Sequence, residues 1–173
     1  MRFHSVLLAL LVLLAGCGRE RGRMAVDQAA KDGILLLGNG AEPKGLDPHL
    51  VTGVGEHNIL SALLEGLVAE DPRTLDPVPG AAESWEVSAD GLTYTFRLRE
   101  DARWSNGDPV VAADFVFSYQ RMLSPGLGAE YAYMLYPLRN AREFNEGKLG
   151  DFAQVGATAA DERTLVLELH HPV

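Results

Sequence analysis

Three acidic residues, Glu83, Glu86 and Asp90, lie close enough together in the sequence to suggest a pair of catalytic carboxylates. Paired carboxylates can cleave glycosidic bonds, one as general acid and the other as nucleophile or base. Here the three residues lie on a predicted hairpin whose turn is Ala89-Asp90-Gly91, and acidic residues are common at such turns. No other catalytic feature accompanies them, so we interpret them as turn residues.

The histidines form two pairs that could be considered for metal binding. His49 and His57 are eight residues apart, without an acidic residue at metal-ligand spacing. His170 and His171 are adjacent, so in a strand their side chains would point to opposite faces. The sequence also lacks a P-loop and a GxSxG nucleophile elbow. We therefore expect no metal, no cofactor and no enzymatic activity.

The only cysteine, Cys17, directly follows an apolar run over residues 6–15. A transmembrane helix needs about twenty apolar residues, so this run suits the core of a signal peptide instead. Leu14-Ala15-Gly16-Cys17 resembles a bacterial lipobox, in which the cysteine becomes the lipidated first residue of the mature protein. We expect residues 1–17 to be a lipoprotein signal peptide and residues 18–32 a flexible tether. The lipid on Cys17 would hold the protein on the extracytoplasmic side of a membrane, in the periplasm or at the cell surface.

The composition is that of a folded, acidic protein. Of the 173 residues, 47% are hydrophobic and 23% charged, which excludes a disordered chain. The formal net charge of −9 gives no electrostatic footprint for nucleic acid.

A predicted β-hairpin organises the middle of the chain. Residues 83–88 alternate in strand fashion, and Asp90-Gly91 supplies the turn. Residues 92–99 then alternate with period two, which predicts a half-buried strand. The apolar face of this strand carries Leu92, Tyr94, Phe96 and Leu98. We expect Trp85 and Trp104, which belong to the same pattern, to pack in the core, and the alternative for both is contact with a ligand.

The remaining periodicities predict a mixed α/β fold. A short apolar run at 34–37 indicates a buried strand, and the proline-rich segment 71–80 a loop. Gly66 is a possible C-terminal cap for the first long helix. We expect helices at 56–67, 112–123, 130–136 and 140–146, and a closing hairpin built from 153–159 and 164–169.

Three blocks of the sequence resemble one protein family. Residues 84–110 read SWEVSADGLTYTFRLREDARWSNGDPV, residues 41–67 AEPKGLDPHLVTGVGEHNILSALLEGL, and residues 155–173 VGATAADERTLVLELHHPV. These blocks are similar to the family 5 extracytoplasmic solute-binding proteins, the oligopeptide- and dipeptide-binding receptors of ABC importers.

The resemblance implies a periplasmic binding protein-like class II fold of mixed α/β type, with two lobes joined by a hinge. Family members are much longer than this chain. Residues 33–70 would form the N-terminal part of the first lobe. Residues 71–173 would form an inserted subdomain, truncated at its C-terminus, and the second lobe would be missing.

The resemblance also implies a function. The chain would be a substrate-binding lipoprotein, monomeric, that captures peptides and delivers them to the transmembrane subunits of an ABC permease. Some relatives take nickel complexes, haem or sugars instead, and an extracytoplasmic hydrolase remains a further alternative.

By position in the family, the backbone of Thr52, Gly53 and Val54 would line the ligand cleft. An extended segment can pair with a peptide as an added strand, whatever the peptide's side chains. The alternative is an ordinary loop before the next helix. Tyr131 occupies the place of a tyrosine that faces the cleft, and packing in the core is the alternative for it.

Overall fold

The structure is a computed structural model that describes residues 21–173. The chain divides into an N-terminal unit that ends at Gly40 and a larger unit, Ala41–Val173. Helices and strands both contribute to the larger unit, so the predicted mixed α/β class is confirmed. The larger unit spans the predicted boundary at residue 70, because strands on either side of that boundary pair with each other.

The N-terminal unit contains one described helix and no described strand. Residues Arg21–Lys31 form helix α2, within residues 18–32, for which a flexible tether stays a prediction. This segment is rich in residues of high helix propensity, which need no apolar stripe to favour a helix. Residues 34–37 form no strand, and Leu35 and Leu37 are 79% and 81% exposed. The predicted buried strand is wrong because no neighbouring strand among the described residues accepts its hydrogen bonds.

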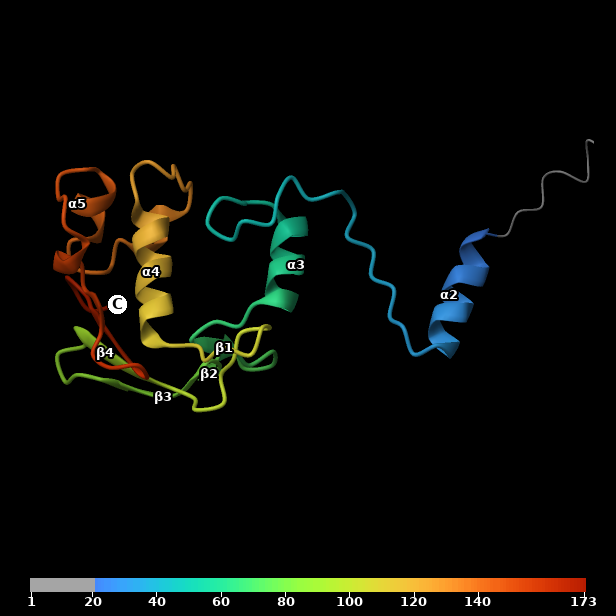
Figure 1. Cartoon of the computed structure of the whole chain (residues 1–173), viewed down its shortest axis with the longest axis horizontal. Coiled ribbons are helices and arrows are strands. Elements are labelled where there is room, and N and C mark those ends of the chain that lie inside the picture. Colours follow the sequence, from blue (N-terminus) through green and yellow to red (C-terminus); the bar gives the residue numbers. More distant parts are fainter. Residues whose placement is uncertain (1–20) are drawn as a thin grey trace, which may run out of the picture. The chain divides into compact units, whose positions relative to one another are not determined.

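A four-stranded antiparallel sheet forms the base of the larger unit (Figure 1). Its strand order is β3-β4-β6-β5, so the central hairpin pairs with the closing hairpin through β4 and β6. The strands are β3 (Ala82–Val87), β4 (Thr93–Leu98), β5 (Ala157–Ala159) and β6 (Thr164–Glu168). Both hairpins were predicted, but β5 begins four residues later than expected because Phe152–Gln154 forms the short 3-10 helix η2.

The predicted turn between β3 and β4 is confirmed. Gly91 has a φ angle of +70°, which a residue without a side chain adopts at little cost. Asp90 accepts hydrogen bonds from the Ser88 hydroxyl at 2.5 Å and from the Leu92 backbone N–H at 3.0 Å. The acidic residue therefore stabilises the turn, as the sequence indicated, rather than forming part of a catalytic pair.

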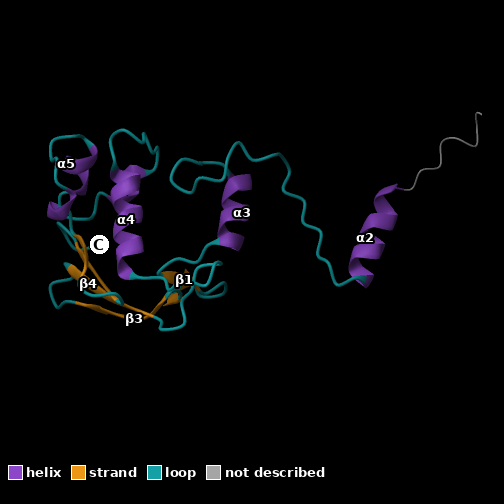
Figure 2. Cartoon of the chain, viewed as in Figure 1, coloured by secondary structure: helices purple, strands orange, loops and turns teal. Residues whose placement is uncertain are grey.

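Helix α4 (Ala112–Leu123) lies over the sheet, as predicted from its apolar stripe. Figure 2 shows α4 and α5 (Ala141–Asn145) on the same side of the strands. One hydrophobic core lies between α4 and the sheet and contains Phe96, Leu98, Ala112 and Leu165. A second core lies between the end of α4, the 3-10 helix η1 (Ala132–Leu135) and α5. Trp85 packs against the first core and stacks on Phe96, with 6.4 Å between ring centroids.

The N-terminus of α4 lacks a hydroxyl cap, because Val111 occupies the N-cap position. Asp114, in the first turn of the helix, provides other hydrogen bonds at this end of α4. Its Oδ2 accepts hydrogen bonds from the backbone N–H of Val111 and from the indole N–H of Trp104, both at 3.0 Å. Trp104 is thus held at the surface, 46% exposed, and its predicted place in the core is wrong.

Helix α3 (Val54–Leu63) precedes a small two-stranded sheet. The helix begins two residues before and ends four residues before the predicted limits, so Leu64, not Gly66, is its C-cap. Strand β1 (Val68–Glu70) pairs with β2 (Pro77–Pro79). We expected a loop at β2 because proline cannot donate a hydrogen bond. Proline is nevertheless compatible with a strand at the edge of a sheet.

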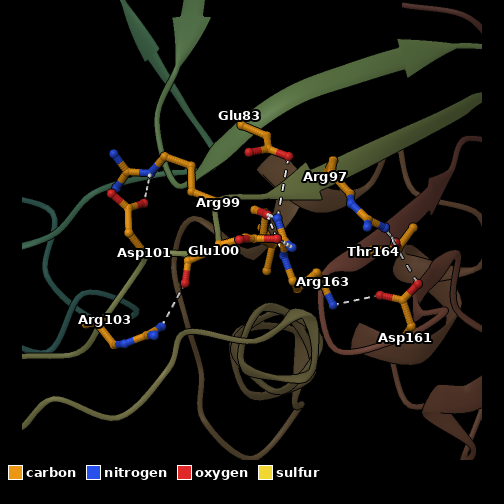
Figure 3. A network of polar contacts seen from close by, with 10 residues as sticks. Glu83, Arg97, Arg99, Glu100, Asp101, Arg103, Asp161, Arg163 and Thr164 are labelled. Carbon is orange, nitrogen blue, oxygen red and sulfur yellow. Dashed lines mark hydrogen bonds and ion pairs between the residues drawn. The ribbon is translucent and has the colours of Figure 1, made fainter.

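Arg163, in the turn between β5 and β6, ties the two hairpins together (Figure 3). Its Nε and Nη2 donate to the carbonyl oxygen of Leu98 at 3.1 and 2.9 Å. Its guanidinium also pairs with the carboxylates of Glu100 and Glu83. The carbonyl of Leu98, at the end of β4, therefore accepts its hydrogen bonds from the Arg163 side chain. Glu83 forms an ion pair with the same arginine.

Candidate functional site

The segment Thr52–Val54 connects a tight turn to helix α3. Gly53 has extended backbone angles, φ −88° and ψ 150°, and is the N-cap of α3, while Val54 is the first helical residue. Thr52 and Val54 are exposed, Val54 to 77%. Within the described part of the chain, no protein group bonds to the backbone N–H or carbonyl of Thr52. The structure therefore places free, extended backbone here, although the extended stretch ends at Gly53 because Val54 belongs to the helix.

Asp47 organises the turn before this segment. Its carbonyl oxygen accepts the backbone N–H groups of Leu50 and Val51, both at 3.1 Å. Its carboxylate accepts the backbone N–H of His49, also at 3.1 Å. An aspartate that bonds its own backbone two residues further along is a recurrent device for fixing a turn. The turn therefore holds the chain up to Val51 and leaves Thr52 without backbone bonds.

Arg121, on helix α4, binds this turn through Asp47. The guanidinium donates from Nη1 to Oδ1 at 2.8 Å and from Nη2 to Oδ2 at 2.5 Å. Such a bidentate pair fixes orientation as well as distance. The side-chain hydrogen bonds from Arg121 lower the pKa of Asp47 to about 2. Both side chains are about one-third exposed, so solvent screens the pair and its main effect is to set geometry.

His49 makes a second connection between the turn and α4. Its Nδ1 lies 2.6 Å from Arg121 Nη1, and its Nε2 lies 2.9 Å from the hydroxyl of Ser118. A guanidinium can only donate, so Nδ1 must accept, and the imidazole is neutral with its proton on Nε2. Burial and the neighbouring positive charge lower the pKa of His49 below its ordinary value. We define these four residues, Asp47, His49, Ser118 and Arg121, as the turn clamp.

Glu56 holds the other end of the segment. Its Oε1 accepts the backbone N–H of Lys44 at 2.8 Å, and this bond is the largest of the effects that lower the Glu56 pKa. The carboxylate also lies over Gly53, where an added Cβ would come 2.0 Å from Oε2. A side chain at position 53 would therefore push the Glu56 carboxylate out of this position.

Tyr131 lies at the start of η1, 40% exposed, with its ring edge-to-face against Tyr133 at 6.1 Å. Tyr133 and Met134 are exposed as well. Packing in the core, the alternative for Tyr131, is therefore not what the structure shows. Tyr136, in contrast, does pack against the second core, and it donates a hydrogen bond to Asn145. In the part of the chain described, no hydrogen bond or ring contact joins Tyr131 to the Thr52–Val54 segment.

The other residues considered from the sequence lie elsewhere. His170 and His171 follow the end of β6, so the alternation expected of a strand does not apply to them, and their facing nitrogens are 2.8 Å apart. Among residues 21–173, no cluster of three or more potential metal ligands occurs. No described helix is both long enough and apolar enough to span a bilayer. Cys17 and the predicted signal peptide lie outside the described residues.

The sequence pointed to the Thr52–Val54 segment, whose role in ligand binding stays a prediction, but it did not point to the turn clamp. Ser118 and Arg121 lie about seventy residues after Asp47 and carry no local pattern that pairs them with it. The available signal was their spacing: positions 118 and 121 are three apart and therefore share one face of α4, beside the apolar stripe.

Comparison with known proteins relates the whole chain to one group. Residues 76–173 match the bacterial extracellular solute-binding proteins, family 5 Middle. The periplasmic oligopeptide-binding protein OppA of Haemophilus influenzae is 46% identical over 141 residues, which cover 80% of this chain and 26% of the relative. The dipeptide-binding protein DppE of Bacillus subtilis is 37% identical over 174 residues, covering 95% of this chain and 31% of the relative.

Solved structures agree with the sequence comparison. The crystal structure of H. influenzae OppA in complex with RPPGFSPFR has a TM-score of 0.73 and 47% identity, over 78% of this chain and 26% of that one. The murein tripeptide binding protein MppA of Escherichia coli has a TM-score of 0.72 and 37% identity, over 76% and 26% of the two chains. The chain thus spans about a quarter to a third of the length of these relatives.

The family match covers the two hairpins, in agreement with two of the blocks noted in the sequence, and the matched relatives extend over most of the chain. The chain therefore belongs to the bacterial extracellular solute-binding proteins of family 5.

Proposed function

We propose that this chain contributes to a receptor that captures peptides outside the cytoplasm and delivers them to the transmembrane subunits of an ABC permease. The observation that carries the proposal is its similarity to OppA of H. influenzae, at 47% identity and a TM-score of 0.73, in a crystal structure with the peptide RPPGFSPFR. A relative described as probably deoxycholate-binding is 35% identical, which makes a non-peptide solute the second candidate.

The Thr52–Val54 segment is our candidate for the ligand-binding backbone. Its support is chemical: Thr52 has an exposed peptide group without protein partners, between two anchored ends. A peptide that pairs with such backbone is bound without regard to its side chains. Tyr131 is our second candidate, because an exposed phenol can pack along a ligand and also donate a hydrogen bond.

We propose no catalytic role. The contact between Ser118 and His49 places a hydroxyl beside an imidazole, as in a hydrolase. In a serine hydrolase, however, a carboxylate accepts a hydrogen bond from the other ring nitrogen and stabilises the protonated imidazole. Here that nitrogen faces a guanidinium, which opposes protonation. His49 is therefore poorly suited to act as a general base.

A chimera tests the peptide-binding proposal. Replacing the matching region of H. influenzae OppA with residues 41–173 should give a receptor that binds RPPGFSPFR within roughly tenfold of the parent, about 1.4 kcal/mol. In the chimera, Thr52→Pro removes the backbone N–H and should weaken binding roughly tenfold more, whereas Thr52→Ala keeps the N–H and should not. Calorimetry would measure both. A chimera that binds deoxycholate and no peptide would instead favour the second candidate.

The 173-residue chain alone should bind the same peptide much more weakly than OppA does. Binding sites usually bury most of a ligand's surface, and this chain corresponds to about a quarter of that protein. We expect an affinity lower by at least about 100-fold, or about 2.7 kcal/mol. Calorimetry on both proteins would measure the ratio, and an affinity of the isolated chain within tenfold of that of OppA would contradict this expectation.

We also propose that Cys17 carries a lipid that anchors the protein. The support is its position directly after the apolar run at residues 6–15, in a sequence that resembles a lipobox. Cys17→Ser should move the protein from the membrane fraction to the soluble extracytoplasmic fraction, because a thiol is needed for the thioether to the lipid. Gly18→Ser, next to it, should leave the protein in the membrane fraction. If both variants stayed in the membrane fraction to the same extent, a lipid anchor on Cys17 would be contradicted.

A further inference from the structure

We propose that His49 is a positioning residue that adds a second connection between helix α4 and the turn before the Thr52–Val54 segment while its imidazole is neutral, and that acid breaks this contact with Arg121 and so loosens the segment. The consequence for ligand binding rests on the proposed function. The dependence of the His49 contact on protonation is a property of the turn clamp alone and can be tested without any ligand.

The geometry requires a neutral imidazole. Arg121 Nη1 donates to His49 Nδ1 across 2.6 Å, and the hydroxyl of Ser118 accepts from Nε2 at 2.9 Å. A proton on Nδ1 would place an N–H against a guanidinium N–H at this distance and bring two positive charges together. The contact must then break, because neither group can turn into an acceptor.

The charged groups that act on His49 are Arg121 from α4 and Asp47 from its own turn. Asp47 favours a positive imidazole, but its carboxylate is already engaged by both guanidinium nitrogens and by the His49 backbone. Burial and Arg121 oppose the positive charge, and together they lower the pKa of His49. The pKa of Asp47 is about 2, so this carboxylate stays ionised far below the ordinary pKa of a histidine. Protonation of His49 therefore changes one member of the clamp while the Asp47–Arg121 pair keeps its charges.

Loss of the His49 contact would affect the position of the Thr52–Val54 segment, because few other contacts hold that segment in place. The backbone of Thr52 has no protein partner in the described residues, and the segment is held only at its ends. One end is the Asp47 turn, which carries His49, and the other is Gly53 under the carboxylate of Glu56. When the imidazole gains a proton on Nδ1, its contact with Arg121 is lost, whereas the bond from Nε2–H to Ser118 and the Asp47 anchor of the turn remain.

The sign of the effect follows from the direction of the pKa shift. A folded-state pKa below the ordinary value of 6.5 means that the neutral form is favoured by folding. The contribution of this contact to stability is therefore fully present above pH 6.5 and is lost as the pH falls through the lower, folded-state pKa.

Nuclear magnetic resonance of the ¹⁵N-labelled chain between pH 7.5 and 5.0 tests the proposal. The amide signals of Thr52 and Gly53 should shift with the same midpoint as the His49 ring protons, and that midpoint should lie below 6.5. In His49→Gln the side chain can still accept and donate but cannot titrate, and the acid-dependent shift should be lost. His57→Gln, the same change one helical turn into α3, should leave the shift in place.

Three results would overturn the proposal: amide signals at residues 52 and 53 that do not follow His49, a shift that persists in His49→Gln, or one that disappears in His57→Gln. The comparison of midpoints in the unaltered protein decides the question even if a variant fails to fold. Failure of peptide binding in the chimera would leave these shifts as they are, so the two proposals fail separately.

Discussion

Gly156→Ala is expected to lower the free energy of unfolding by about 3 kcal/mol, the upper part of the range for overpacking a well-packed site. A methyl group at this position would lie 2.2 Å from the carbonyl oxygen of Glu168 and 3.0 Å from its carbon. Both atoms belong to backbone, so they cannot move aside as the end of a flexible side chain could. Either the strands separate or the register changes.

The close approach at Gly156 is part of a ring of backbone hydrogen bonds. Gly156 accepts from the N–H of Glu168 at 2.8 Å and donates to the carbonyl of Arg139 at 2.9 Å. Arg139 in turn donates to the carbonyl of Glu168 at 2.8 Å. This ring joins the end of β6 to the segments before α5 and β5. Separating the chains to admit a methyl group would weaken all three bonds, which is why we expect a large effect.

Urea unfolding monitored by tryptophan fluorescence would measure the change, since the denaturant midpoint follows stability when the slope is constant. Gly150→Ala is the matched control, because nothing lies within 4 Å of the Cβ that it would add. We expect its stability to stay within about 0.5 kcal/mol of the parent. Equal stability of the two variants would contradict the close packing at Gly156.

The sequence predicted best those elements whose periodicity and partners lie close together in the chain. The hairpin of β3 and β4 combines period-two alternation with a glycine turn, and α4 begins and ends at the predicted residues. Local pattern and tertiary packing agree there. Prediction failed where the outcome depends on distant partners. Residues 34–37 have the composition of a strand but no neighbour among the described residues to pair with, and Pro77–Pro79 became a strand because β1 offers an edge.

The same limit applies to the candidate site. The residues that resemble the family, Thr52–Val54, can be found from the sequence, because a motif precedes them. The contacts that hold this segment could not be found from the sequence, because Asp47 and Arg121 are 74 positions apart and no local pattern connects them. Trp104 shows the converse error. The strong pattern to which Trp104 belongs predicted that it is buried, but its indole donates to Asp114 at the surface, beside the N-terminus of α4.

Leu123→Ala is expected to lower the free energy of unfolding by about 2–5 kcal/mol, because it removes a fully buried side chain and leaves a cavity. Leu123 is the last residue of α4 and belongs to the core formed with η1 and α5, beside Phe144 and Leu138. Its backbone carbonyl accepts a hydrogen bond from Asn145 at 2.9 Å, and the substitution keeps that bond. The loss therefore measures side-chain packing, and it should appear as a lower denaturant midpoint.

Phe117→Ala supplies the control within the same helix, because it removes a larger side chain that is 66% exposed. If α4 presents the stripe of Ala112, Val116 and Leu123 to the cores, the larger deletion should cost less than about 0.5 kcal/mol, since surface substitutions usually have small effects. A larger loss for Phe117→Ala than for Leu123→Ala would mean that α4 is rotated about its axis. The face that carries Ser118 and Arg121 would then no longer meet Asp47, and the turn clamp would be lost with it.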